Sequence, residues 1–281
     1  MLVSNTLWVL ILAILPIILY SYLVYFLVPK NFISTHRARR YLVAGFLSPM
    51  LINLFYFLFP NWGDPQSSIL ALALLILAFL QVGVLEESAK FVTFWWVSKE
   101  RSSEKYDLPI ATMFYSMMSA VGFAITENIF YLIREQRRIT EIQKMVPFDL
   151  DISRELLTMA EQRSLTAVIA HMICGVIMGY FLAKAHNYQF NSPLEDNTFL
   201  KNKNILYGII AAASFHGVYD YNLFLEDNTY AGTFAIIILI FGLVIGRFII
   251  NDLIKESILF KEKQQTINCC KVENEIKEQN I

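Results

Sequence analysis

The stretch Val84-Leu85-Glu86-Glu87-Ser88-Ala89-Lys90-Phe91 sets two carboxylates and an ammonium inside an apolar run at residues 69–97. This run is long enough to cross a bilayer, which takes about 20 apolar residues. A charged side chain near the middle of a membrane helix costs about 2.5 to 3.5 kcal/mol. On a helix Glu86 and Lys90 share one face, whereas Glu87 points about 100° away. We therefore expect these charges to have partners on other helices.

The composition is that of a membrane protein rather than a soluble domain. Of the 281 residues, 56% are hydrophobic and only 17% are charged, and the mean hydropathy is +0.48. The formal charge of -1 hides an uneven distribution between loops and tail and says nothing about nucleic acid, and we expect no nucleic-acid partner for a chain of this class. Cys174 lies in an apolar segment and Cys269 and Cys270 lie in the polar tail, so no disulfide framework is predicted and the role of the tail pair is open.

Seven segments are apolar and long enough to cross the membrane, at residues 7–28, 41–59, 69–97, 110–133, 164–185, 205–225 and 231–250. Residues 7–28 lack the basic leader and cleavage site of a removable signal peptide, so we expect them to remain in the mature protein. The next loop is basic, with Lys30, Arg37, Arg39 and Arg40. The seven apolar segments therefore predict an all-α, multi-pass bundle. The positive-inside rule places its N-terminus outside and its C-terminus in the cytoplasm.

Residues 1–250 form the predicted transmembrane domain, with its core motifs at 84–220, and residues 251–281 form a charged, partly disordered cytoplasmic tail. Residues 134–163 make a polar insert whose basic and acidic residues balance. We predict two short helices there, broken near Pro147, on the outer side of the membrane. The insert either lies at the entrance to the site, where it contacts a substrate, or serves as a solvated connector.

Further ionisable residues lie within the predicted spans, namely Glu127, His171, His216 and Asp220. With Glu86, the first three lie roughly 16 to 26 Å from the cytoplasmic ends of their helices, at 1.5 Å per residue. Ionisable residues at one depth on four helices favour a site between facing helices. The plainer alternative is a set of structural ion pairs. Lys90 argues against it, because this only cation near the membrane centre cannot neutralise four carboxylates.

Two histidines with spare carboxylates suit a divalent metal. We expect His171, His216 and Glu127 to be ligands, as in catalytic zinc sites that keep an open position for water. Glu86 or Glu87 would accept a proton from that water, with Lys90 setting the choice.

Asp220, one turn after His216, would orient that imidazole or act as a further ligand. The amide of Asn128 would donate to an oxyanion or, with equal weight, form a hydrogen bond between helices. Cys174, three residues from His171, is expected to pack rather than to bind metal.

Four ordered motifs resemble the PrsW family of intramembrane proteases: Glu86-Glu87-x-x-Lys90, Phe123-x-x-x-Glu127-Asn128, His171-x-x-x-Gly175 and His216-x-x-x-Asp220. The resemblance implies hydrolysis of a peptide bond in a membrane-anchored protein, typically a regulator such as an anti-sigma factor, in a bacterial cytoplasmic membrane. The oligomeric state is not implied.

The PrsW family is distantly related to the CAAX prenyl proteases. Their first motif usually has Arg one residue later and their second ends in His, where this chain has Glu127, which argues against prenylated substrates. The same comparison leaves the cofactor open between a divalent metal, with Zn²⁺ favoured, and metal-free glutamate chemistry with an oxyanion site.

Two other functions use the same residues. A transporter would relay protons or bind a cation through them, but the chain shows neither the internal repeat nor the mid-span proline common in such proteins. A non-catalytic member of the scaffold would bind a partner, but a complete carboxylate and histidine set argues against it. Proteolysis is therefore the favoured function.

Overall fold

The structure, a computed structural model, describes scattered residues between 11 and 26 and residues 28–59, 75–99, 108–145, 152–191, 198–224 and 231–279. These residues contain helices and no strand, so the predicted all-α class is confirmed for them. In chain order the helices are η1 (Lys30–Phe32), α2 (Thr35–Leu47), α3 (Pro49–Leu58), η2 (Ala78–Val84), α5 (Leu85–Lys99), α6 (Pro109–Met145), α7 (Ile152–Leu165), α8 (Ala167–Asn191), α9 (Thr198–Phe224) and α10 (Ala231–Gln279).

Four helical stretches within the described residues are long and apolar enough to cross a membrane: Thr35–Leu58, Pro109–Met145, Arg154–Ala185 and Gly232–Lys263. The chain is therefore a multi-pass membrane protein. The predicted spans 69–97 and 205–225 fall on η2–α5 and α9, whose ionisable residues lower their hydropathy. Most of the predicted span 7–28 lies outside the described residues. Seven crossings and the orientation of the termini stay predictions.

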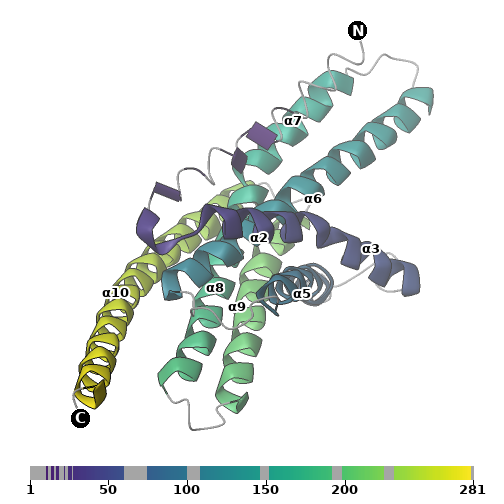
Figure 1. Ribbon diagram of the computed structural model, residues 1–281. Helices are drawn as coiled ribbons and strands as arrows, with labels where there is room; N and C mark the ends of the chain where they lie inside the picture. Colours follow the sequence, from purple (N-terminus) through teal and green to yellow (C-terminus); the bar gives the residue numbers. More distant parts are fainter. Residues whose placement is uncertain are drawn as a thin grey trace.

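Helices α6 and α8 form the centre of the bundle, with α2 packed on α6 and α9 packed on α8 (Figure 1). Small residues allow the central pair to touch. A Cβ on Gly175 would lie 2.8 Å from Met117 Cα, and one on Gly179 would lie 2.6 Å from Met113 Cα. The absence of a side chain at these two glycines therefore lets the backbones of α6 and α8 approach closely.

The polar insert forms a hairpin that extends from the bundle (Figure 1). The prediction of a separate first helix is wrong, because α6 continues to Met145 without interruption. The physical reason is that residues 134–145 contain no Gly or Pro and are rich in good helix formers. The predicted second helix is α7, and its Leu156 and Ala160 pack against Leu132 and Ile139 of α6.

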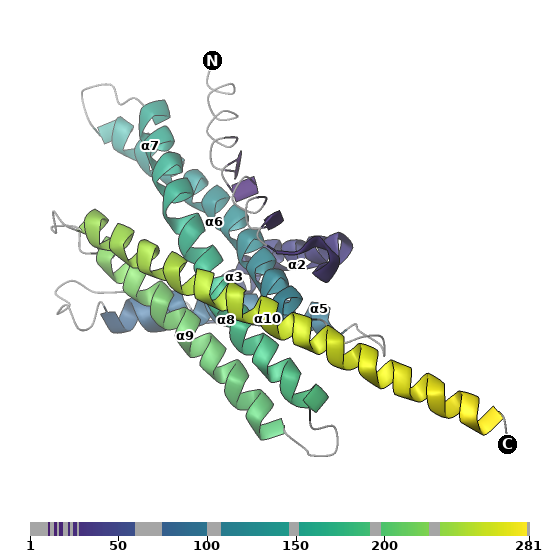
Figure 2. The same cartoon turned by 90° about the vertical axis from the view of Figure 1, so that its left-hand side faces the viewer.

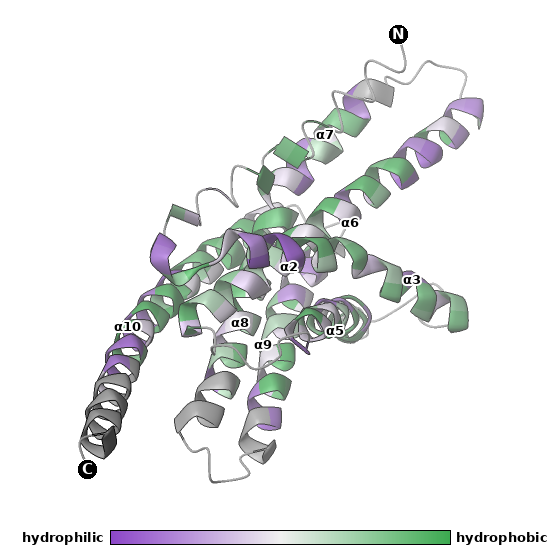
Figure 3. Cartoon of the chain, viewed as in Figure 1, coloured by the Kyte–Doolittle hydropathy of each residue, from purple (hydrophilic) through white to green (hydrophobic). Residues whose placement is uncertain are grey.

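The C-terminal segment is helical as far as Gln279, and a partly disordered tail stays a prediction. Helix α10 extends past the bundle to Gln279 (Figure 2). Leu253 and Ser257 are fully buried, and Ser257 Oγ accepts a hydrogen bond from the Ile110 N–H at 3.0 Å. This packing anchors the helix beyond its apolar half. Figure 3 shows the apolar residues of α10 in its first half, and polar residues toward the outer end of α6.

Candidate active site

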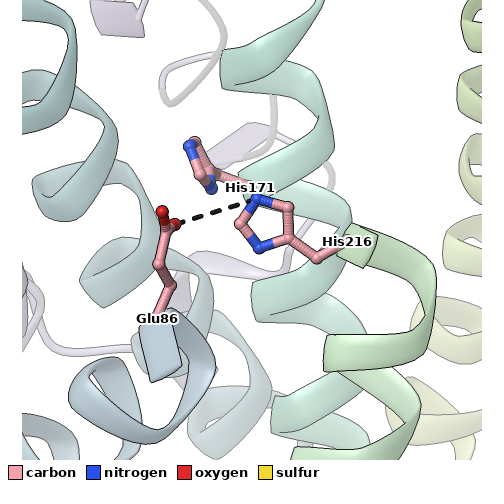
Figure 4. A group of neighbouring side chains, drawn as sticks. All are labelled: Glu86, His171 and His216. Atoms are coloured by element: carbon pink, nitrogen blue, oxygen red, sulfur yellow. Dashed lines mark ion pairs between the residues drawn. The ribbon is translucent and has the colours of Figure 1, made fainter. Parts of the chain in front are cut away.

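Four helices bring the predicted site residues together. Glu86, Glu87 and Lys90 lie in the first turns of α5, and the others come from α6, α8 and α9. Figure 4 shows the side chains of Glu86, His171 and His216 meeting between their helices. The predicted convergence of these residues is therefore confirmed.

A π-helix immediately precedes the carboxylates. In η2 the backbone packs against α9 so closely that a Cβ on Gly83 would lie 2.4 Å from the carbonyl oxygen of Ala213. From the other side, a Cβ on Gly217 would lie 2.8 Å from Phe79 Cα. This close approach of two backbones sets the start of α5 against His216. Single π-turns are often found at functional sites.

Lys90 supplies positive charge to the carboxylate pair. Its Nζ donates to Glu87 Oε1 at 2.7 Å and lies 3.7 Å from Glu86 Oε2. The same atom lies 3.1 Å from His171 Nδ1 and 4.0 Å from the ring centre of Phe123. Lys90 is only 4% exposed, so these contacts replace the water that the ammonium would otherwise hold.

His216 is oriented by Glu87. The Nδ1 atom lies 3.0 Å from Glu87 Oε1, and an ionised carboxylate can only accept, so Nδ1 carries the hydrogen and donates. The Nε2 atom then faces Asp220 Oδ2 at 3.3 Å and Glu86 Oε2 at 3.8 Å. One of the two roles predicted for Asp220 was to orient the His216 imidazole. In the structure Glu87 bonds His216 Nδ1, and Asp220 lies beside Nε2.

Glu127 joins His171 to a residue that the sequence analysis missed. Its Oε2 lies 2.6 Å from His171 Nε2 and accepts a hydrogen bond from Arg163 Nη2 at 2.7 Å. Arg163 also stacks on Tyr131, 3.7 Å from the ring centre. The prediction that Lys90 is the only cation in this layer is therefore wrong. Arg163 precedes His171 by eight residues, about two helical turns, and that spacing was the signal available in the sequence.

Asn128 takes part in the same contact. Its Oδ1 accepts a hydrogen bond from Arg163 Nε at 2.9 Å, and the residue is 1% exposed. This geometry matches the second of the two predicted roles, a hydrogen bond between helices. The role at an oxyanion stays a prediction.

The site opens onto a cavity of about 870 Å³, whose lining includes Glu86, Glu127, His171, His216 and Asp220. Glu87 and Lys90 line a separate void of only about 10 Å³. Glu86 Oε2 is buried and has no hydrogen-bond partner among the described residues. Of the two adjacent carboxylates, Glu86 is thus the one that lines the large cavity.

The donor atoms suit a divalent metal. One atom each of Glu86, His171 and His216 lie within 4.8 Å of one another, and a second such group is Glu87, Cys174 and His216. Donor atoms that all lie about 2.0 to 2.3 Å from one zinc ion cannot lie more than about twice that distance from one another. The separations within the first group are compatible with this limit after a small adjustment of side chains. In the second, Cys174 Sγ donates to the carbonyl oxygen of Ala212 at 3.6 Å, as expected for a packing residue. The predicted set with Glu127 in place of Glu86 stays a prediction.

Comparison with known proteins gives one family. The family model of the PrsW family intramembrane metalloprotease matches residues 37–246. The protein named Protease PrsW of Clostridioides difficile strain 630 is 25% identical over 213 residues, which are 75% of this chain and 74% of that protein. Protease PrsW of Oceanobacillus iheyensis is 28% identical over 151 residues, 54% of this chain and 56% of that protein. No solved structure matches.

Proposed function

The chain belongs to the PrsW family of intramembrane metalloproteases, and from this premise we propose that it hydrolyses a peptide bond in a membrane-anchored protein. The substrate class is a membrane-anchored regulator of the anti-sigma-factor kind. The protein acts in a bacterial cytoplasmic membrane with seven crossings, the N-terminus outside and the C-terminus in the cytoplasm. Neither a transporter nor a non-catalytic scaffold is favoured by this membership.

One observation carries the mechanism: Glu86 lines the cavity together with His171 and His216, and its Oε2 has no hydrogen-bond partner among the described residues. We assign Glu86 as the general base that takes a proton from the attacking water and returns it to the leaving amine. Glu87 is not the base, because Lys90 and His216 both bond its Oε1. Its role is to hold His216 in place.

The histidines act on the carbonyl oxygen of the scissile bond. When bound, a divalent metal such as Zn²⁺ would polarise that carbonyl as a Lewis acid. His171 and His216 would hold it with one carboxylate, and we assign Glu127 to that place because Glu86 is the better placed base. In the metal-free alternative, His216 with Asp220 beside it donates to the oxyanion.

The α6–α7 hairpin also belongs to the substrate path in this proposal. Tyr131, Arg134, Met159 and Arg163 from this hairpin line the cavity. These contacts support a role at the entrance rather than that of a connector. Deleting residues 137–158 should reduce cleavage of a tethered substrate, and unchanged cleavage would count against the role.

Cleavage of a membrane-tethered reporter by purified protein in lipid vesicles tests the function. Glu86→Gln should reduce the rate by at least about 100-fold, the typical contribution of a positioned general base. Glu141→Gln is the matched control, because Glu141 pairs with Lys144 on the exposed end of the hairpin. A folded Glu86→Gln protein that cleaves at the wild-type rate would disprove the proposal.

A further inference from the structure

Two carboxamide side chains line the cavity without a role in the site described above. They are Asn53 of α3 and Gln81 of η2. Neither makes a hydrogen bond within the part of the chain that the structure describes. Asn53 and Tyr56 are the only polar residues of α3, whose sequence is Pro-Met-Leu-Ile-Asn-Leu-Phe-Tyr-Phe-Leu. The Asn53 side chain is exposed, and an amide that meets hydrocarbon without a hydrogen-bond partner is costly, whereas a polar ligand in the cavity would satisfy it.

The π-helix explains how Gln81 comes to face the site. In an uninterrupted α-helix, residues five apart point about 140° from each other. A π-helix bonds residue i to residue i+5, which turns residues five apart toward one face. Gln81 lies in η2, five residues before Glu86, and both side chains line the same cavity. The π-turn therefore brings a carboxamide to the side of the general base.

The substrate of the proposed reaction has a need that carboxamides meet. A carbonyl inside a membrane helix is bonded within that helix, so the segment must unwind before water can attack it. Unwinding exposes backbone N–H and C=O groups that find no water in the hydrocarbon region. A carboxamide offers two donors and an acceptor, and it can pair with both groups of one peptide unit.

We propose that Asn53 and Gln81 hydrogen-bond the main chain of an unwound substrate segment and hold it beside Glu86. This inference rests on the proposed function. The cavity of about 870 Å³ lies within the range of ~300 to 1,000 Å³ found for ligand pockets, which suits a short extended segment. Recognition through the main chain selects segments that unwind easily, rich in Gly, Pro or Asn, rather than a particular side-chain sequence.

Kinetics of a membrane-tethered reporter test the inference. Asn53→Leu and Gln81→Leu should each lower kcat/KM about tenfold, which corresponds to about 1.4 kcal/mol. Asn222→Leu is the matched control and should leave kcat/KM unchanged, because the Asn222 Nδ2 donates to Val218 of its own helix at 2.6 Å. Gln81→Glu, which loses the donors but keeps the size, repeats the test with a second variant.

Cross-linking gives a readout that does not depend on turnover. In a Glu86→Gln background, Asn53→Cys and Gln81→Cys should form disulfides with a single cysteine in the cleaved segment of the reporter. Asn222→Cys should form none.

The outcomes separate the two proposals. Cleavage by the wild-type protein that does not require Glu86 overturns the proposed function, and this inference with it. Cleavage that requires Glu86 but is unchanged in both leucine variants, or cross-linking at neither Asn53 nor Gln81, overturns this inference alone.

Discussion

Replacing Lys90 by methionine removes positive charge from a buried carboxylate pair at nearly constant side-chain length. The Lys90 Nζ lies 2.7 Å from Glu87 Oε1 and 3.7 Å from Glu86 Oε2. The side chains of Lys90, Glu87 and Glu86 are 5%, 1% and 13% exposed, so water cannot replace the lost ammonium. In Lys90→Met two adjacent carboxylates remain buried without the ammonium that contacts both of them.

The expected cost follows from burial. Removing one partner of a buried ion pair typically lowers the free energy of unfolding by about 3 to 5 kcal/mol, because an uncompensated charge stays buried. Lys144→Met is the matched control: Lys144 Nζ lies at the same 2.7 Å from Glu141, but their side chains are 63% and 62% exposed. An exposed pair of this kind contributes less than about 1 kcal/mol.

A double variant identifies the cause of the loss. Lys90→Met combined with Glu87→Gln removes the carboxylate that Lys90 contacts most closely, so most of the lost stability should return. Reversible unfolding in mixed detergent micelles, followed by tryptophan fluorescence, measures the free energy of each variant. A stabilising role for Lys90 is refuted if Lys90→Met loses no more free energy of unfolding than Lys144→Met, or if the double variant loses the sum of the two single losses.

Three further predictions follow from contacts in the bundle. Arg163→Gln should lower kcat more than about tenfold while the protein stays folded, because Glu127 loses a charge-assisted hydrogen bond. Arg138→Gln, which removes a surface ion pair, is the control, and an equal kcat in the two variants would contradict the prediction. Gly122→Ala should lower the Tm, because its Cβ would lie 2.1 Å from a backbone oxygen. Gly246→Ala is the control and should leave the Tm unchanged, because the nearest atom to its Cβ would be 3.9 Å away. Equal Tm values for the two variants would refute the close packing at Gly122. Elemental analysis should find less bound divalent metal in Glu127→Gln than in Glu86→Gln, and the reverse order would make Glu86 the carboxylate ligand.

Much of the site could be predicted from the sequence because hydrocarbon imposes a cost that is visible in composition. An ionisable residue within an apolar span is costly unless it has a partner or a function, and this cost distinguishes Glu86, Glu127, His171 and His216 in the sequence. Helical periodicity then placed Glu86 and Lys90 on one face, and the structure confirms their contact. Family membership was predictable from the same residues, because their order along the chain forms the motifs.

The partners across helices were not predictable in this way. Arg163 was assigned to the insert, and only the packing of α7 and α8 on α6 brings its guanidinium to Glu127. The rise in polarity after Ile133 predicts the end of a helix, but α6 continues without a break to Met145.

The choice between Glu86 and Glu87 shows the limit most clearly. Sequence alone determines that adjacent carboxylates point about 100° apart on a helix. It does not determine which one faces the cavity, because that depends on the rotation of α5 against its neighbours. The close contact of η2 with α9 at Gly83 and Gly217 sets this rotation, and it turns Glu87 toward His216 Nδ1 and Glu86 toward the cavity. Periodicity is a local property of the chain, whereas the register between helices comes from the packing of residues far apart in sequence.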